Sequence, residues 1–134
     1  MSPTSILDAS ALLAYLQGEP GAEIVTNALT QGCLISAVNW TEALSKLAER
    51  GQDPDVVTDL LTNQGLLNHA LTIVPFDASL AKETANLRML TRSRGLSLGD
   101  RACLALGIHS QLPVLTSDRV WISISIGAVV QLIR

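Results

Sequence analysis

The sequence predicts an α/β protein, a three-layer α/β/α sandwich around a mainly parallel, five-stranded sheet. The main observation is an alternation along the chain: short apolar segments typical of buried strands are separated by longer segments with apolar residues at helical spacing. The second observation is length. A chain of 134 residues suits one domain with a sizeable core, so we predict a single domain over residues 1–134.

The individual elements are predicted from apolar patterning and from residues that start or stop helices. Short buried segments predict strands within residues 4–8, 33–36, 71–76, 113–118 and 128–134. Apolar residues at helical spacing predict helices within residues 9–17, 22–30, 37–51, 53–67, 77–92 and 98–108. Asp77 is a candidate N-cap. The segment "WISISIG" alternates like a strand, but we favour a short connection there.

Composition limits the classes of protein that the chain can be. Hydrophobic residues make up 48% and charged residues 16%, which is typical of a globular domain. No apolar run has transmembrane length, and "MSPTSILDAS" lacks the basic region and cleavage site of a signal peptide, so we expect a cytoplasmic protein with no membrane partner. Cys33 and Cys103 lack metal-type spacing and are expected to be buried thiols.

Four acidic residues occupy positions that an α/β fold brings to one edge of its sheet. Asp8 closes the first predicted strand, and Asp118 follows the fourth by two residues. Glu42 lies in the first turns of the helix after the second strand, and Asp100 lies in the first turn of the helix that leads into the fourth. Ligands bind open α/β sheets beyond the carboxyl ends of the strands, so these four side chains define a candidate site.

The chemistry of four clustered carboxylates points to divalent metal. Like charges at one place need cations, and oxygen-only ligands suit Mg²⁺ or Mn²⁺. Such a site supports hydrolysis of a phosphodiester, with metal generating the hydroxide and stabilising the attacking and leaving oxygens. Taken one at a time, each residue also has a common structural role, such as a helix cap for Asp8, a solvated helix residue for Glu42 or a turn residue for Asp118. As a set at one edge, they favour a site.

Four blocks of the sequence resemble the PIN-domain ribonucleases, specifically the toxins of VapBC-type toxin–antitoxin pairs. The blocks are "ILDASALLAYLQGEPGAE" with Asp8 and Ser10, "ISAVNWTEALSKL" with Glu42, "GLSLGDRACLAL" with Asp100, and "LPVLTSDRVW" with Thr116 and Asp118. The resemblance implies the sheet order 3-2-1-4-5. It also implies a metal-dependent endoribonuclease with these four acids as catalytic residues and metal ligands. A homodimer and a small antitoxin that covers the active site are the implied partners.

Substrate contacts are expected from polar and basic residues near these acids. Ser10 and Thr116 are candidates because each lies two residues from a site aspartate. Arg101 and Arg119 directly follow site aspartates, and either phosphate steering or a surface ion pair explains them. The net charge of −3 gives no overall attraction to RNA, but four arginines fall close together and form a candidate basic rim, namely Arg88, Arg92, Arg94 and Arg101.

Two tryptophans lie near site carboxylates. Trp40 and Trp121 are close in sequence to Glu42 and Asp118, and aromatic side chains often stack on bases of single-stranded RNA. For Trp40 we favour packing in the core.

The main alternative is a non-catalytic α/β regulatory or binding module that uses the same acidic edge for assembly. A receiver domain would need an acidic pair near the first strand and a lysine after a late strand, whereas Asp8 has no acidic neighbour and Arg119 follows the fourth strand. The helical stretches at 22–30 and 55–67 are candidates for a dimer face or an antitoxin groove, because a small domain this apolar is expected to leave apolar surface outside its core.

Overall fold

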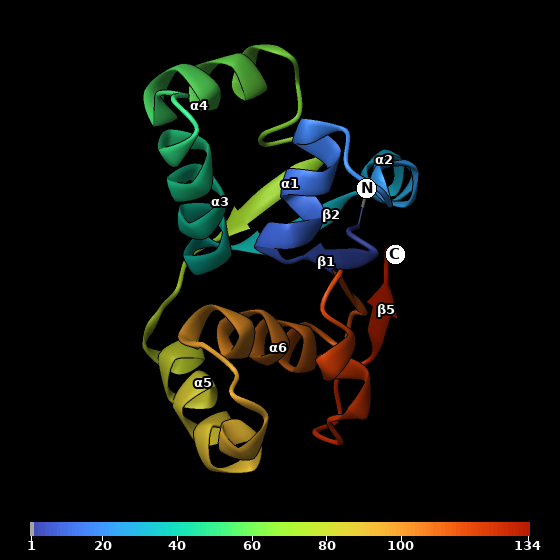
Figure 1. Cartoon of the computed structure of the whole chain (residues 1–134), viewed down its shortest axis with the longest axis vertical. Helices are drawn as coiled ribbons and strands as arrows, with labels where there is room; N and C mark the ends of the chain where they lie inside the picture. The colour runs from blue at the N-terminus through green and yellow to red at the C-terminus, as the bar shows by residue number, and fades with distance from the viewer. Residues whose placement is uncertain (1) are drawn as a thin grey trace.

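The computed structural model describes residues 2–134, which form five strands and six α-helices (Figure 1). The strands are β1 (Ser5–Leu7), β2 (Cys33–Ser36), β3 (Leu71–Val74), β4 (Val114–Thr116) and β5 (Val130–Leu132). The helices are α1 (Ala9–Gln17), α2 (Ala22–Gln31), α3 (Ala37–Glu49), α4 (Pro54–Asn63), α5 (Ala78–Thr91) and α6 (Leu98–Ser110), with short 3₁₀ helices η1 (Arg92–Arg94) and η2 (Arg119–Ser123).

The five strands form one parallel sheet in the order β3-β2-β1-β4-β5, as the sequence and its resemblance predict. β1 lies between β2 and β4, with Leu7 beside Ile35 on one side and Leu115 on the other. The chain builds outward from β1 through β2 to β3 and then returns to the other side with β4. The switch point of the sheet is therefore between β1 and β4, where open α/β proteins bind ligands.

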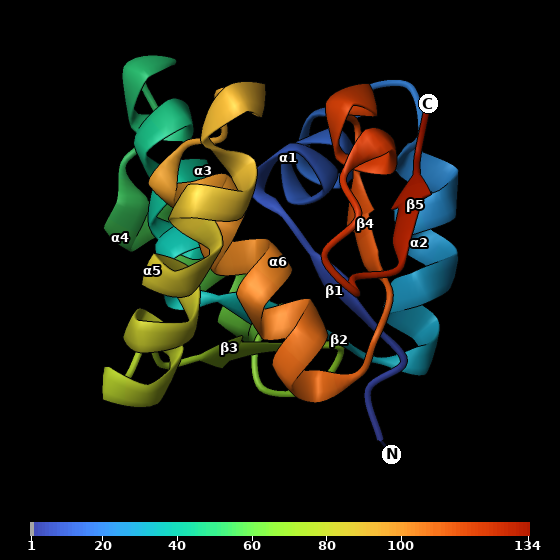
Figure 2. The same ribbon diagram turned by 90° about the horizontal axis from the view of Figure 1, so that it is seen from below.

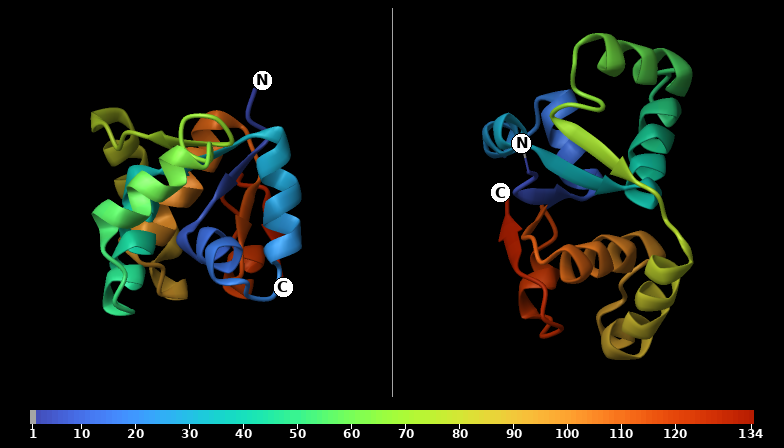
Figure 3. Two further views of the ribbon diagram at one scale, coloured as in Figure 1. Left: turned by 90° about the horizontal axis from the view of Figure 1, so that it is seen from above. Right: turned by 180° about the vertical axis from the view of Figure 1, so that it is seen from behind.

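Alternation of side chains along each strand separates two apolar layers. Leu7, Ile35 and Leu115 pack under α1, α2, α3 and α4. Their neighbours Ile6 and Val114 point the other way and pack with residues of α5, α6 and η2. Figures 1 and 2 show the two helical layers on opposite sides of the sheet, and Figure 3 shows the same arrangement from above and from behind. Parallel strands covered on both faces are continuously apolar, which is why the strand segments contain so few charges.

Acidic and hydroxyl side chains start several helices. Asp77 accepts a hydrogen bond from the backbone N–H of Leu80 at 2.9 Å, so the predicted N-cap of α5 is confirmed. Asp8 caps α1 in the same way, and Ser97 caps α6. An N-cap fixes where a helix begins and which way its first turn faces. Because the first turns of α1 and α6 hold site residues, these caps also position the site.

One predicted helix ends earlier in the structure than the sequence suggests. The helix predicted over 53–67 ends at Asn63, because Gly65 takes a φ of 80°, a left-handed conformation that stops the helix. The segment 121–127 is a connection, as favoured from the sequence: its first residues complete η2 and the rest form no strand. Cys33 and Cys103 are free, buried thiols, as predicted. Within residues 2–134, no helix has both the length and the apolar character needed to cross a membrane.

Candidate active site

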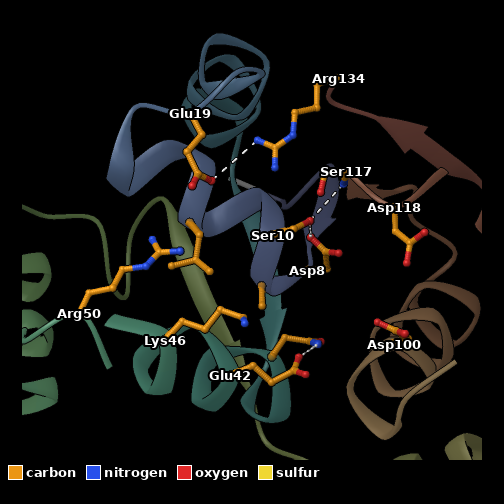
Figure 4. Close-up of a pocket in the computed structure, with 13 residues that line it drawn as sticks. Asp8, Ser10, Glu19, Glu42, Lys46, Arg50, Asp100, Ser117, Asp118 and Arg134 are labelled. Carbon is orange, nitrogen blue, oxygen red and sulfur yellow. Dashed lines mark hydrogen bonds and ion pairs between the residues drawn. The ribbon is translucent and has the colours of Figure 1, made fainter. Parts of the chain in front are cut away.

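The four predicted carboxylates line one pocket of about 480 Å³ at the switch point of the sheet. Asp8 joins β1 to α1 and Asp118 joins β4 to η2, while Glu42 comes from α3 and Asp100 from the first turn of α6. In Figure 4, Asp8 lies near the middle, with Asp100 and Asp118 on one side and Glu42 on another. The tertiary structure thus brings together four acids that are far apart in the sequence.

Asp8 is the most buried of the four, with 6% of its surface exposed. Its Oδ1 accepts hydrogen bonds from the Ser10 hydroxyl at 2.7 Å and from the backbone N–H of Ala11 at 2.8 Å. Its Oδ2 accepts a hydrogen bond from the Thr116 hydroxyl at 2.6 Å. Burial raises the pKa of Asp8 to about 6 in spite of these three bonds, and the negative charge of Asp100 adds to the effect. Metal would favour the ionised form of this carboxylate.

Two hydroxyl groups connect the ends of β1 and β4 through Asp8. The Ser10 oxygen accepts a hydrogen bond from the backbone N–H of Ser117 at 3.0 Å, and the Thr116 oxygen accepts one from the backbone N–H of Asp118 at 3.0 Å. Thr116 is fully buried. Substrate binding by Thr116 stays a prediction, and in this structure the Thr116 hydroxyl bonds only within the chain. Thr116 holds Asp8 and the turn that contains Asp118.

Asn39 positions Glu42 against the first turn of α6. The Asn39 side-chain nitrogen donates to Glu42 Oε1 at 2.8 Å and to the carbonyl of Gly99 at 2.9 Å. Gly99 has no side chain, and a Cβ atom there would collide with the Glu42 carboxylate. Asn39 is 1% exposed, and its Oδ1 atom is buried without a hydrogen-bond partner among the described residues. The sequence analysis proposed neither Asn39 nor Gly99 as a site residue. The clue available in the sequence was the i, i+3 spacing of Asn39 and Glu42, which places both on one face of a helix.

Asp100 and Asp118 each use one oxygen to hold the local backbone. Asp100 Oδ2 accepts from the backbone N–H of Ser97 at 3.0 Å, and the Ser97 hydroxyl accepts from the backbone N–H of Asp100 at 3.1 Å, forming a capping box. Asp118 Oδ1 accepts from the backbone N–H of Val120 at 3.0 Å. Within residues 2–134, the second oxygen of each carboxylate makes no hydrogen bond, so it is available to a ligand.

The pocket also has a basic side that the sequence analysis missed. Lys46 of α3, Arg50 at the C-cap of that helix, and Arg134 line it, and we call these three residues the basic wall. Figure 4 shows Lys46 and Arg50 across the pocket from Asp100 and Asp118. The clue in the sequence was the four-residue spacing of Glu42, Lys46 and Arg50, which places all three on one face of a helix.

The structure does not bring the predicted arginines into the pocket. Arg92 and Arg94 are exposed in η1, and Arg119 is exposed in η2; none of them lines the pocket. Arg101 points to the neighbouring helix, where its Nη1 donates to the carbonyl of Thr84 at 3.2 Å. The reason is geometric: residues adjacent to a site aspartate on a helix point about 100° away from it.

The two tryptophans also pack in the interior. Trp40 packs against the core, as favoured. Trp121 is 1% exposed in the layer under α5 and α6, so it is unavailable for stacking on a base.

The donor set fits a small, hard divalent cation. All the candidate ligands are carboxylate oxygens, and Asn39, whose Oδ1 is buried without a hydrogen-bond partner among residues 2–134, lines the same pocket. Within residues 2–134, no three acidic, histidine or cysteine side chains lie close enough together to form a closed metal site. Mg²⁺ does not require one, because it usually keeps several waters and binds through one or two carboxylates and substrate phosphate oxygens.

The fold and the pocket define a class: a parallel α/β domain with an acidic ligand site at the switch point. The chain belongs to the PIN domain family, whose model matches residues 5–126. PIN domains are generally nucleases. None of the curated proteins matches this sequence.

Solved structures of toxin–antitoxin proteins share the fold. VapBC from Salmonella typhimurium, bound to DNA, has a TM-score of 0.74 at 19% identity and covers 99% of this chain and 100% of its own. FitAcB from Neisseria gonorrhoeae gives 0.69 at 22%, covering 95% and 96%. VapC20 from Mycobacterium tuberculosis, a toxin that cleaves the sarcin-ricin loop, gives 0.70 at 11%, covering 93% and 98%. At these low sequence identities, the likeness shows a shared fold and nothing more.

Proposed function

We propose that this chain is a metal-dependent endoribonuclease that hydrolyses phosphodiester bonds of RNA and acts as the toxin of a type II toxin–antitoxin pair. The observation that carries the proposal is the convergence of Asp8, Glu42, Asp100 and Asp118 on one pocket at the switch point of the sheet. Membership of a family that is generally nucleolytic supports it. The fold shared with VapC20, which cleaves an RNA loop, favours RNA as the polymer.

Asp8, Glu42, Asp100 and Asp118 would hold Mg²⁺ or Mn²⁺, which would activate water for attack and neutralise charge on the phosphate. Asp8 is held by three hydrogen bonds, so its carboxylate keeps one orientation. Asn39 holds Glu42 at the opposite side. The side chains of Asp100 and Asp118 line the pocket from a third direction (Figure 4). No serine, cysteine or histidine nucleophile is needed for this reaction.

The proposed partners are a small antitoxin that covers the pocket and a second copy of the chain, in the cytoplasm. Exposed apolar side chains on α4, Val56 and Leu60, fit the expectation that this helix contributes to a protein interface. The other stretch proposed from sequence, α2, buries its apolar residues Val25 and Leu29 in the core. Light scattering of the purified chain tests the dimer; a monomer at all concentrations would refute it.

A cleavage assay tests the proposed function. The purified chain is incubated with single-stranded and structured RNAs in Mg²⁺, in Mn²⁺ and in chelator, and the products are mapped. We expect internal cleavage that requires the divalent ion. Asp118→Asn, purified in the same way, controls for contaminating nucleases. RNA that is bound but left intact under all metal conditions would favour the non-catalytic binding module.

A further inference from the structure

The basic wall is the part of the pocket that the proposed chemistry does not use. Lys46 lies on α3 and Arg50 is the C-cap residue of that helix, at successive intervals of four residues after Glu42. A four-residue step advances about 6 Å along a helix, so the two cations are spaced along one face that begins at a site carboxylate. That spacing resembles the separation of neighbouring phosphates in an extended strand.

The charges of Lys46 and Arg50 are not neutralised by neighbouring carboxylates. Among residues 2–134 the ion pairs are His109 with Glu83 and Arg134 with Glu19. Glu42, the natural helical partner of Lys46, is instead held by Asn39 and faces α6. Both side chains are exposed and form no ion pair, so they are free to bind an anion, and a lysine ammonium or arginine fork suits phosphate oxygens.

The two arginines of the basic wall are also anchored to the end of α1 and the segment that follows it. Arg50 Nη1 donates to the Gln17 side-chain oxygen at 2.7 Å. Arg134 Nη1 donates to the carbonyl of Pro20 at 2.9 Å and lies 3.7 Å from Glu19 Oε1. Arg134 therefore has a carboxylate partner, whereas Lys46 and Arg50 have none among residues 2–134. These bonds already hold the two arginine side chains in place, so the arginines lose less conformational entropy when they bind a phosphate.

We propose that Lys46 and Arg50 form a phosphate subsite that holds the RNA strand beside the cleaved bond, with the strand running along α3 from Glu42 toward Arg50. The inference rests on the proposed nuclease function and names how its substrate is held. It also offers a way for a chain of net charge −3 to hold an anionic polymer: Lys46 and Arg50 place two positive charges together at the pocket.

A binding experiment with matched charge changes tests this proposal. The probe is a fluorescein-labelled, single-stranded 12-nucleotide RNA, measured by anisotropy at several salt concentrations in chelator and, over short times, in Mn²⁺. The test variant is Lys46→Gln with Arg50→Gln. The control is Arg92→Gln with Arg94→Gln, which removes the same charge outside the pocket. All four residues are exposed, and thermal melting checks that both variants are folded.

We expect the test variant to bind roughly tenfold more weakly, with a salt slope shallower by about 1.4, because each lost contact to a single strand accounts for about 0.7. The control should keep the wild-type affinity and slope. Equal losses in both variants, or no loss in the test variant, would overturn the subsite. So would an oligoglutamate peptide that displaces the RNA more effectively than unlabelled RNA of equal charge, since the basic wall would then be a protein-docking surface.

The outcome separates this inference from the nuclease proposal. If the wild type binds RNA through Lys46 and Arg50 but never cleaves it, the subsite stands and the nuclease proposal fails. If the wild type cleaves RNA and both double variants cleave and bind as it does, the nuclease proposal stands and the subsite fails.

Discussion

Replacing Asp8 by asparagine should stabilise the metal-free protein at neutral pH, although Asp8 is a proposed metal ligand. The cause is the burial of its charge. Burial raises the pKa of Asp8 from its ordinary value of 3.8 to about 6, so the folded state opposes ionisation of this group. Between these two values the folded protein binds more protons than the unfolded chain, and the free energy of unfolding falls as the pH rises.

The size of the effect follows from the two pKa values. The difference between 3.8 and about 6 corresponds to about 3 kcal/mol lost from the stability of the wild type above pH 6 and absent below pH 3.8. Asparagine carries no charge, so it avoids this loss. In the wild type, the Thr116 hydroxyl donates a hydrogen bond to Asp8 Oδ2. In the variant, the asparagine NH₂ group takes the place of this oxygen, so two donors face each other, and this mismatch costs about 1 kcal/mol. We expect a net gain of about 2 kcal/mol at pH 7.5.

The assay is urea unfolding of wild type and Asp8→Asn in chelator, at pH 7.5 and at pH 4.5. For a chain of this length, a gain of about 2 kcal/mol also raises the melting temperature by roughly 6 °C. The difference between the two proteins should shrink at pH 4.5, where the wild-type carboxyl is mostly protonated. Because the other acids are the same in both proteins, their effect cancels in the difference between the two unfolding free energies. Asp59→Asn, at an exposed position of α4, controls for the change in net charge.

Adding Mn²⁺ should reverse the order of stability, because a ligand that binds the folded state stabilises it and the variant has lost a ligand oxygen. An Asp8→Asn protein that is less stable than wild type in chelator at pH 7.5 would refute the reasoning, since it would mean that the hydrogen bonds of the ionised carboxylate outweigh its burial. A difference that does not change with pH would refute it equally.

Three further substitutions test the other parts of the site. Asp118→Asn should abolish cleavage and leave the melting temperature within about 2 °C, because an asparagine oxygen can still cap Val120; full activity would remove Asp118 from the catalytic set. Gly99→Ala should lower cleavage by roughly tenfold or more without unfolding the chain, because the new Cβ displaces the flexible end of Glu42. Added to Glu42→Gln, it should lower cleavage little further. Additive losses of activity would contradict this coupling. Asn39→Ala should weaken Mn²⁺ binding by roughly 10-fold to 100-fold in calorimetry, as other losses of a hydrogen bond to a metal ligand do, and unchanged affinity would assign Asn39 a purely structural role.

Much of the fold and the positions of the four acids could be predicted from the sequence alone. Apolar segments and helical periodicity are local properties, and in this chain they agree with the final elements at nearly every position. The carboxyl ends of parallel strands must meet at one edge, so the sequence alone predicts that Asp8 and Asp118 share a site. Asp100 is predicted to lie at the same edge, because the helix that leads into a parallel strand must begin there.

The supporting contacts required the tertiary structure. Asn39 reaches the carbonyl of Gly99, sixty residues away in the chain, and Thr116 reaches Asp8 across the switch point. The sequence gives no pattern for such contacts, because they depend on how two elements approach each other. The same holds for charge: the arginines nearest to site acids in sequence face other directions, while Lys46 and Arg50 enter the pocket because α3 lies along it. Local periodicity determines which residues share a face, and only the packing of helices on the sheet determines what that face meets.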